Sequence, residues 1–178
     1  GDRVVVIGGG NTAMDAASES ARMGAQSVTL AYRRSREEMS AYGFEYELAK
    51  SVGVKALFHV SPVKIEGRAR VEGLTLIRTQ LIDGVLKEIP GSEFFEPCDW
   101  VIRATGQSKQ TAFLSQIQGL QLDAQGRIIA DPHTFQTSNP RYFAAGDAVN
   151  GGVEVVNAVA EAKRAAQGIF LFINHIPQ

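Results

Sequence analysis

Apolar positions in the first thirty residues follow a pattern that predicts a strand, a helix and a second strand. Val4–Ile7 is a short apolar run rich in β-branched residues, which is typical of a buried strand. From Thr12 to Met23 the apolar residues recur at helical spacing. Ser27–Tyr32 is again short and mostly apolar, so it predicts a second strand. A helix between two strands is typical of a parallel sheet.

The middle of the chain predicts one more helix and then a change from parallel to antiparallel strands. Helical spacing from Glu45 to Val52 ends at Gly53, a residue type that commonly terminates helices. Asp83-Gly84 separates two apolar runs and is a strong signal for a tight hairpin. The expected strands are Val54–Phe58 in the parallel sheet, followed by Val63–Glu66, Val71–Leu81 and Val85–Ile89 as antiparallel strands.

The last strand of the parallel sheet and a second folding unit are expected in the remainder of the chain. Asp99–Ala104 predicts a strand that returns to the sheet, and Thr105-Gly106 turns at its carboxyl end, where ligands of such sheets bind. A domain boundary is expected between Gly106 and Thr111. Beyond this boundary the pattern predicts a hairpin at Leu122–Ile129, a short buried strand at Tyr142–Ala145 and a helix from about Val153, with Trp100 and Phe143 in the core.

Composition, net charge and the content of cysteine and histidine limit the classes of protein to which the chain can belong. The chain has 178 residues, 44% of them hydrophobic and 21% charged, which suffices for one or two small domains with a core. The net charge of −1 does not suggest a nucleic-acid partner, and the longest apolar stretch, Ile169–Ile173, is too short to span a membrane. Cys98 is the only cysteine, so this chain alone can form neither a disulfide nor a cysteine-ligated iron–sulfur cluster. His59, His133 and His175 lack ligand spacing, so no metal site is expected, and the cytoplasm is the expected compartment.

The link between the first strand and the first helix carries the strongest chemical signal. It consists of Gly8-Gly9-Gly10-Asn11-Thr12-Ala13, which fits the pattern G-x-G-x-x-(G/A) in its strand–turn–helix context. There Gly8 permits the tight turn, Gly10 lets the backbone approach a pyrophosphate, and Ala13 keeps the helix close to the sheet. The helix N-terminus directs unpaired N–H groups at the phosphates. The sequence therefore predicts a dinucleotide site, and the alternative is a tight β–α turn in another doubly wound protein.

The end of the second predicted strand indicates which dinucleotide the site prefers. In NAD-binding proteins an acidic residue at this place accepts hydrogen bonds from the ribose 2′-hydroxyl. Here the strand is followed by Arg33-Arg34-Ser35-Arg36, and the first carboxylate is Glu37. Guanidinium groups bind phosphate through charge-assisted and often bidentate hydrogen bonds. Arg33 and Arg34 therefore predict a preference for NADP, and the alternative is a solvated basic loop.

Three motifs that follow one another along the chain resemble a known family. Val4–Ala17 with Ala31–Met39, then Ala104-Thr105-Gly106, then Thr137–Asp147 resemble segments of glutamate synthase small-subunit-like oxidoreductases, whose NADPH-binding domain dihydropyrimidine dehydrogenase shares. The resemblance covers nearly the whole chain. It implies an α/β fold with a Rossmann-like parallel sheet, an antiparallel three-stranded meander and a partial FAD-binding domain. The implied domains are residues 1–106, which bind NADP(H), and residues 107–178, the C-terminal part of the FAD-binding domain.

The resemblance also implies which residues bind cofactors, namely NADP(H) and, in the complete protein, FAD. Asp147 would accept hydrogen bonds from the ribityl chain of FAD, Gly146 would let the flavin approach, and the next helix would point its N-terminus at the flavin ring. The implied cofactor-binding residues are Gly8, Gly9, Gly10, Asn11, Thr12, Ala13, Arg33, Arg34, Ala104, Thr105, Gly106, Gly146, Asp147, Glu154, Val155 and Val156. No catalytic or metal-binding residue is assigned, because the flavin performs the redox chemistry. Ser40 and Ala162 depart from the family, which usually has proline and glycine there.

The start of the chain suggests a fragment. The sequence begins at Gly1-Asp2, immediately before the first strand, and it contains no second G-x-G-x-x-G motif. In the family that the sequence resembles, the NADPH-binding domain is inserted into a flavin domain that has its own glycine-rich turn. We therefore expect a fragment that consists of the inserted NADPH-binding domain and the C-terminal part of an interrupted flavin domain, and a naturally short protein is the alternative.

The resemblance implies an NADPH-dependent oxidoreductase. In the parent protein, hydride would pass from NADPH to FAD and electrons would pass on to iron–sulfur centres or a partner subunit. The isolated chain would then be inactive, and an NADP-binding module without turnover is the alternative function. A structural protein with a degenerate nucleotide fold is a third interpretation, against which the intact glycine and arginine positions argue. The expected partners are a nicotinamide nucleotide, an electron-accepting subunit or iron–sulfur domain, and a second copy of the fragment.

Overall fold

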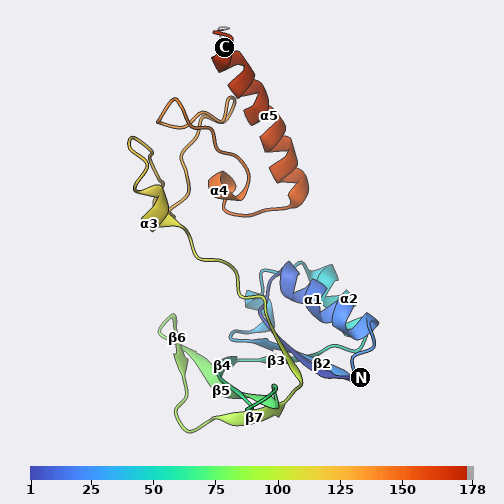
Figure 1. Cartoon of the computed structure of the whole chain (residues 1–178). Helices are drawn as coiled ribbons and strands as arrows, with labels where there is room; N and C mark the ends of the chain where they lie inside the picture. The colour runs from blue at the N-terminus through green and yellow to red at the C-terminus, as the bar shows by residue number, and fades with distance from the viewer. Residues whose placement is uncertain (176–178) are drawn as a thin grey trace. The chain divides into compact units, whose positions relative to one another are not determined.

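The computed structural model describes residues 1–175, and the chain divides into two compact units, Gly1–Gly106 and Gln107–Gln178 (Figure 1). The first unit contains a parallel sheet, an antiparallel sheet and the helices α1 and α2. The described part of the second unit contains the helices α3 to α5, and a long irregular segment joins α3 to α4. The mixed α/β class expected from the sequence is confirmed.

The parallel sheet of the first unit has four strands in the order β3-β2-β1-β8. The strands are β1 Arg3–Ile7, β2 Ser27–Tyr32, β3 Lys55–Phe58 and β8 Trp100–Arg103. Helix α1 (Asn11–Arg22) connects β1 to β2, and helix α2 (Gly43–Ser51) precedes β3. The end points of these six elements lie within two residues of the expected ones. Strand β1 is central, with β2 and β8 as its parallel neighbours.

The antiparallel sheet is built around a long strand, β5. Its strands are β4 Val60–Glu66, β5 Gly73–Ile82, β6 Val85–Glu88 and β7 Phe94–Pro97. The β5–β6 hairpin turns at Asp83 and Gly84, whose φ angles of 53° and 74° are those of the turn predicted from the sequence. Strand β7 was not expected, and it pairs with the first half of β5. A Cβ built on Gly73 would lie 2.2 Å from the ring of Phe95, so this pairing needs a glycine in β5.

Two apolar layers hold the first unit together, one on each face of the parallel sheet. The α1 and α2 side buries Val4, Val6, Met14, Ala17, Leu30 and Ala49. The side of the antiparallel strands buries Val5, Ile7, Ala31, Leu74, Leu76 and Cys98. Alternate residues of a strand point to opposite faces, so a strand covered on both sides must be apolar throughout. This explains why all four residues of Val4–Ile7 are apolar. Cys98 is buried, as expected from the sequence.

The second unit contains less regular structure than the pattern predicts. Its helices are α3 Thr111–Leu114, α4 Asp147–Asn150 and α5 Val155–Ile173. The expected hairpin at Leu122–Ile129 is reduced to one bridge between Leu122 and Ile128. The expected buried strand at Tyr142–Ala145 is wrong: this segment forms one bridge, from Phe143 to Gln136, and Tyr142 is 46% exposed. A strand needs neighbouring strands to bond its backbone, and within the described part of the second unit this segment has none.

Helix α5 packs against an irregular segment at a point of close backbone contact. A Cβ built on Gly168 would lie 2.1 Å from the carbonyl oxygen of Thr134, so glycine is required at this crossing. The next residue, Phe135, is buried with a φ of 59°, and the guanidinium of Arg164 lies 5.0 Å from the centre of its ring. Phe172 makes an edge-to-face contact with Phe143, which is half-buried rather than fully in the core.

Trp100 was expected in the core and is instead 60% exposed. It lies on β8, the edge strand of the parallel sheet, and pairs in register with Val4. Its indole Nε1 donates a hydrogen bond to Oδ2 of Asp2 at 2.9 Å. An edge strand has a neighbouring strand on one side only. The strand order that makes β8 an edge strand cannot be read from the local sequence.

Arg3 and Asp99 join the start of β1 to the residue before β8, and this pair predicts a pH dependence of stability. The backbone N–H and Nε of Arg3 donate to Oδ2 of Asp99 at 2.8 and 3.0 Å, and Nη2 donates to Oδ1 at 3.0 Å. These hydrogen bonds lower the pKa of Asp99 to about 2, against roughly 3.9 in an unfolded chain. The ionised carboxyl therefore stabilises the fold above about pH 4, and this stabilisation is lost as the pH falls toward 2.

Asp99→Asn is expected to lower the free energy of unfolding at pH 7 and to have a progressively smaller effect between pH 4 and pH 2. Urea unfolding of both proteins across this range measures the difference. A difference that stays constant with pH would show that the charge of Asp99 does not stabilise the fold.

Candidate functional site

The turn after β1 brings three strands of the parallel sheet into close backbone contact. The N–H of Gly8 donates to the carbonyl of Ala31 in β2 at 3.1 Å, and the N–H of Ala104 donates to the carbonyl of Ile7 at 2.8 Å. Gly8 has a φ of 150°, and a Cβ built on it would lie 2.2 Å from the carbonyl oxygen of Ala104. The same Cβ would lie 3.1 Å from that of Ala13, which is fully buried in α1. The turn therefore requires glycine at position 8 and a small residue at position 13.

Helix α1 begins with backbone donors that the protein itself does not use. Gly10 is the N-cap residue, no side chain caps the helix, and the carbonyl of Gly10 accepts from Ala13 and Met14 at 2.9 and 3.2 Å. Within residues 1–175 the N–H groups of Gly10, Asn11 and Thr12 make no hydrogen bond. Unpaired N–H groups at the positive end of a twelve-residue helix form a site for an anion such as phosphate.

The loop after β2 folds back onto this turn. The N–H of Ala41 donates to the carbonyl of Gly9 at 3.0 Å, and the N–H of Tyr42 donates to Oδ1 of Asn11 at 2.9 Å. A Cβ built on Gly9 would lie 2.3 Å from the ring of Tyr32, so this position also excludes a side chain. Ser40 places its Oγ 3.4 Å from a Cβ built on Gly10. Ser40, one of the two positions that depart from the family pattern, is therefore in contact range of the glycine turn.

The three arginines after β2 differ in the contacts that their guanidinium groups make with other side chains. Arg33 is exposed, and its guanidinium has no partner among residues 1–175. Nη1 of Arg34 lies 3.4 Å from Oε1 of Glu38, while its Nε is buried without a hydrogen-bond partner among the described residues. Arg36 pairs with Glu47, and its guanidinium lies 4.7 Å from the centre of the Tyr46 ring. Arg33 and Arg34 thus have guanidinium donors without a partner among the described residues, whereas the guanidinium of Arg36 has two neighbouring side chains.

Ala104, Thr105 and Gly106 follow β8 at the same edge of the sheet. Gly106 has a φ of 86°, and no atom lies within 4 Å of a Cβ built on it, so the backbone here is open to a ligand. The carboxyl ends of the parallel strands lie at one edge of the sheet. One set of the predicted cofactor-binding residues follows these ends and therefore lies at this edge. That set is Gly8, Gly9, Gly10, Asn11, Thr12, Ala13, Arg33, Arg34, Ala104, Thr105 and Gly106.

The second unit holds the remaining predicted residues around the N-termini of α4 and α5. Gly146 is the N-cap of α4 with a φ of 67°, and its N–H donates to Oε2 of Glu161 at 2.7 Å. A Cβ built on Gly146 would lie 3.3 Å from Cβ of Ala158, which leaves little space for a side chain. Asp147 is exposed at the start of α4, and Glu154 is the N-cap of α5, followed by the exposed Val155 and Val156.

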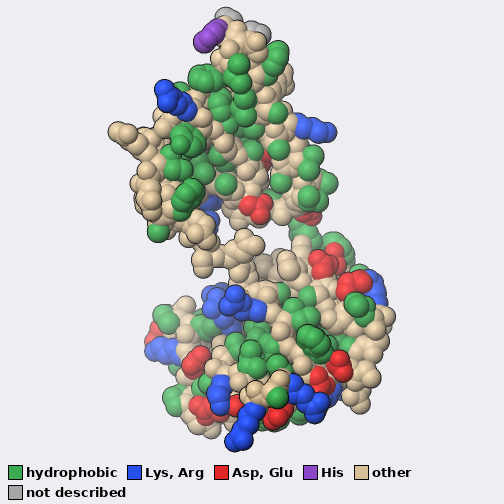
Figure 2. All heavy atoms as spheres, viewed as in Figure 1, with side chains coloured by type: hydrophobic (Ala, Val, Ile, Leu, Met, Phe, Trp, Pro, Cys, Tyr) green, Lys and Arg blue, Asp and Glu red, His purple; other side chains and the backbone are tan. Residues whose placement is uncertain are grey.

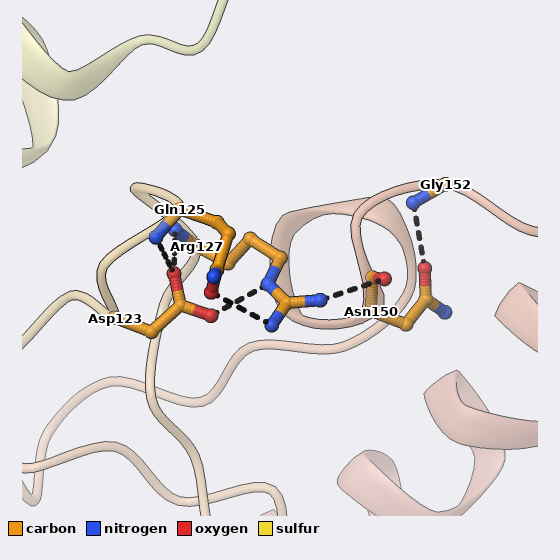
Figure 3. Close-up of polar contacts among 5 residues, drawn as sticks. All are labelled: Asp123, Gln125, Arg127, Asn150 and Gly152. Carbon is orange, nitrogen blue, oxygen red and sulfur yellow. Dashed lines mark hydrogen bonds and ion pairs between the residues drawn. The ribbon is translucent and has the colours of Figure 1, made fainter.

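A polar network that sequence reasoning missed fixes the loop after Asp147. Arg127 donates from Nε to Oδ2 of Asp123 at 2.6 Å and from Nη1 to the carbonyl of Asn150 at 3.3 Å (Figure 3). Oδ1 of Asn150 accepts from the N–H of Gly152 at 2.9 Å. The backbone N–H of Arg127 is the main cause of a lowered pKa at Asp123, so the network carries an ionised carboxylate. Asp123 and Arg127 lie on either side of a turn, so the i, i+4 rule for helices gave no sequence signal for this pair.

Glu161 connects this network to Gly146. Its carboxylate accepts from Nδ2 of Asn150 at 3.1 and 3.2 Å as well as from the N–H of Gly146. Helix α5 is thereby tied to both ends of α4, which orients Asp147. No cluster of metal-ligating side chains occurs among residues 1–175. None of the helices in this range is both long and apolar enough to cross a bilayer.

Curated proteins of known name are similar to this chain over nearly its whole length. The glutamate synthase (NADPH) small chain of Escherichia coli (strain K12) is 43% identical over 180 residues, covering 95% of this chain and 38% of that protein. The NADP(+)-dependent formate dehydrogenase subunit beta of Moorella thermoacetica is 41% identical over 176 residues, covering 95% of this chain and 25% of that protein. The chain spans about two fifths or less of the length of these relatives.

A solved structure and a family profile agree with these similarities. The crystal structure of thioredoxin reductase from T. acidophilum matches with a TM-score of 0.79 and 27% identity, covering 99% of this chain and 54% of that chain. The profile described as pyridine nucleotide-disulphide oxidoreductase matches residues 1–162, which include both sets of predicted residues. The chain therefore belongs to the pyridine nucleotide-disulphide oxidoreductase family.

Proposed function

We propose that the chain is the nucleotide-binding part of a flavin-dependent oxidoreductase, in which hydride passes from NADPH to FAD and electrons continue to iron–sulfur centres or a partner subunit. Membership of the family and the names of the relatives, which include an NADPH-dependent and an NADP(+)-dependent enzyme, support an NADP-linked reaction. The observation that carries the proposal comes from the first unit. The free N–H groups of α1 and the two available arginines lie at one edge of one sheet.

The first unit, residues 1–106, would bind NADP(H). The N–H groups of Gly10, Asn11 and Thr12 would donate to the pyrophosphate, which the absence of a side chain at Gly10 allows to come close. Arg33 and Arg34 would donate to the 2′-phosphate of the adenosine ribose. Hydride transfer itself is supplied by the nicotinamide and the flavin.

The second unit, residues 107–178, would be part of an FAD-binding domain. The carboxylate of Asp147 would accept hydrogen bonds from the ribityl hydroxyls, and the network through Glu161 and Asn150 would hold it in position. The α5 N-terminus at Glu154–Val156 would place the positive end of the helix near the flavin ring, where it stabilises negative charge. The last three residues of this unit lie outside the described residues.

Thermal unfolding in the presence of NADP or NAD tests the nucleotide assignment. At equal concentration, the nucleotide that binds the folded chain more tightly raises the unfolding temperature more, so NADP should raise it more than NAD. Unchanged unfolding with both nucleotides would refute the assignment. Binding of NADP without oxidation of NADPH by an artificial electron acceptor would give this chain the alternative role of a binding module.

The chain is also expected to associate with a second copy of itself through α5. Hydrophobic side chains gather on the surface of the second unit (Figure 2), and those exposed on α5 include Val155, Val156, Val159, Phe170 and Ile173. Monomers rarely expose a contiguous apolar patch of this kind, and two-fold dimers are the commonest assembly. Light scattering at micromolar concentration should show a dimer, and Val159→Glu with Phe170→Glu should shift it to a monomer. A monodisperse wild-type monomer would contradict the prediction.

A further inference from the structure

Arg34 already has an anionic partner within the chain. Its Nη1 lies 3.4 Å from Oε1 of Glu38, and both side chains are partly exposed. The Nε of the same guanidinium is buried and has no hydrogen-bond partner among residues 1–175. A guanidinium offers five donors, so one contact with Glu38 leaves Arg34 incompletely satisfied. The Glu38 carboxylate therefore already lies beside the guanidinium of Arg34, which the proposed function would use to bind the 2′-phosphate.

The position of Glu38 is set by the local backbone rather than by Arg34. Oε2 of Glu38 accepts from the N–H of Ser35 at 3.2 Å, in a capping box over the single 3₁₀ turn Arg36–Glu38. The carbonyl of Glu38 accepts from the hydroxyl of Tyr32 at 2.8 Å. The contact with Arg34 is long, since charge-assisted hydrogen bonds of this kind are usually about 2.7–2.9 Å. A stronger anion can therefore replace Glu38 on Arg34, although Glu38 itself remains nearby.

We propose that Glu38 competes with the 2′-phosphate of a bound dinucleotide for Arg34 and so limits the preference of the site for NADP over NAD; the inference rests on the proposed function. A phosphate monoester carries a charge of about −1.5 to −2 at neutral pH. To bond Nη1 of Arg34 the phosphate must displace the Glu38 carboxylate, and on the other donors it lies beside that carboxylate, so the two like charges repel. NAD has no phosphate at this position, so its binding does not depend on Glu38. Glu38 is thus a specificity-determining residue.

Glu38→Gln is the variant that isolates the charge. The glutamine oxygen can still accept from the N–H of Ser35, so the cap over the turn is kept while the negative charge is removed. Titration calorimetry with NADP and NAD should show about threefold to tenfold tighter NADP binding, the range expected for an exposed charge pair plus the relief of repulsion. NAD binding should change by less than about twofold. The gain for NADP should shrink at high salt, because exposed charges are screened.

Two comparisons make the test specific. Glu37→Gln removes the same charge one position earlier, from a side chain that does not contact Arg34, and should change NADP binding less than Glu38→Gln. In an Arg34→Ala background, Glu38→Gln should give a smaller gain, because the competition for the guanidinium is gone and only the repulsion between Glu38 and the phosphate remains. Thermal unfolding of each variant, which should match that of the wild type, checks that the loop is intact.

The results that would overturn the inference differ from those that would overturn the proposed function. Unchanged or weaker NADP binding by Glu38→Gln, an equal gain from Glu37→Gln, or an equally large gain in the Arg34→Ala background would each show that Glu38 does not compete at Arg34. A wild-type chain that binds neither nucleotide would remove the proposed function and this inference together. A wild-type chain that prefers NAD, but that Glu38→Gln shifts toward NADP, would refute the expected preference and support the inference.

Discussion

Replacing Arg33 and Arg34 together with alanine is expected to weaken NADP binding by roughly 2–4 kcal/mol, the net effect of losing two charge-assisted hydrogen bonds to a phosphate. This corresponds to a rise in the dissociation constant of about 30-fold to 1,000-fold. NAD binding should be nearly unchanged, because NAD lacks the 2′-phosphate that we propose these guanidinium groups bind. Titration calorimetry with both nucleotides measures the two effects on the same protein preparation.

Arg36→Ala is the matched control for this double substitution. It removes the same kind of charge from the same loop, but its guanidinium is already held by Glu47 and Tyr46. NADP binding by Arg36→Ala should therefore stay close to that of the wild type. An equal loss of NADP and NAD affinity in the double variant would show that Arg33 and Arg34 support the loop or the pyrophosphate instead of the 2′-phosphate.

Gly8→Ala is expected to destabilise the first unit by about 2–5 kcal/mol, the sum of a strained backbone conformation and a steric overlap. The new methyl group would be built 2.2 Å from the carbonyl oxygen of Ala104, which is backbone and cannot rotate away. Relief of the overlap requires separation of β1 from β8 at the edge where the nucleotide would bind. Urea unfolding should show the loss as a lower midpoint, and nucleotide binding should weaken for NADP and NAD alike.

Gly24→Ala separates the two contributions to this effect. Gly24 also has a positive φ, of 92°, but no atom lies within 4 Å of a Cβ built on it. The alanine variant at position 24 should therefore carry the conformational strain alone, about 1–2 kcal/mol. If Gly8→Ala and Gly24→Ala lowered the stability equally, the contact between the glycine turn and Ala104 would have no energetic significance.

The first unit was largely predictable because several local signals agree there. Val4–Ile7, the glycine turn and the apolar positions of α1 each predict the same strand–turn–helix arrangement, and the structure has these elements within a residue of their expected ends. The arginines after β2 were also visible, because their place is fixed by the strand that precedes them. What could not be seen was how the loop folds back. Glu38 contacts Arg34 only because a 3₁₀ turn and the Tyr32 hydroxyl bring it there.

Features that depend on distant neighbours were predicted least well. Strand β7 has four residues and ends in Pro97, and it is a strand because β5 lies beside it. Tyr142–Ala145 has the apolar pattern of a buried strand, but the described part of the second unit offers it no sheet to join. Glu161 lies 15 residues from Gly146, whose N–H donates to it, and no motif connects the two. Local pattern predicts an element, whereas its pairing depends on tertiary contacts.

Trp100 provides an optical probe of the unfolding of the first unit. The chain has a single tryptophan, and it lies on the edge strand β8 of the first unit. Selectively excited indole emission therefore reports the unfolding of Gly1–Gly106, whereas far-ultraviolet circular dichroism is dominated by helices, of which α5 in the second unit is the longest described. Two signals that change at the same denaturant concentration would indicate one cooperative transition, and separated midpoints would give each unit its own stability from one sample.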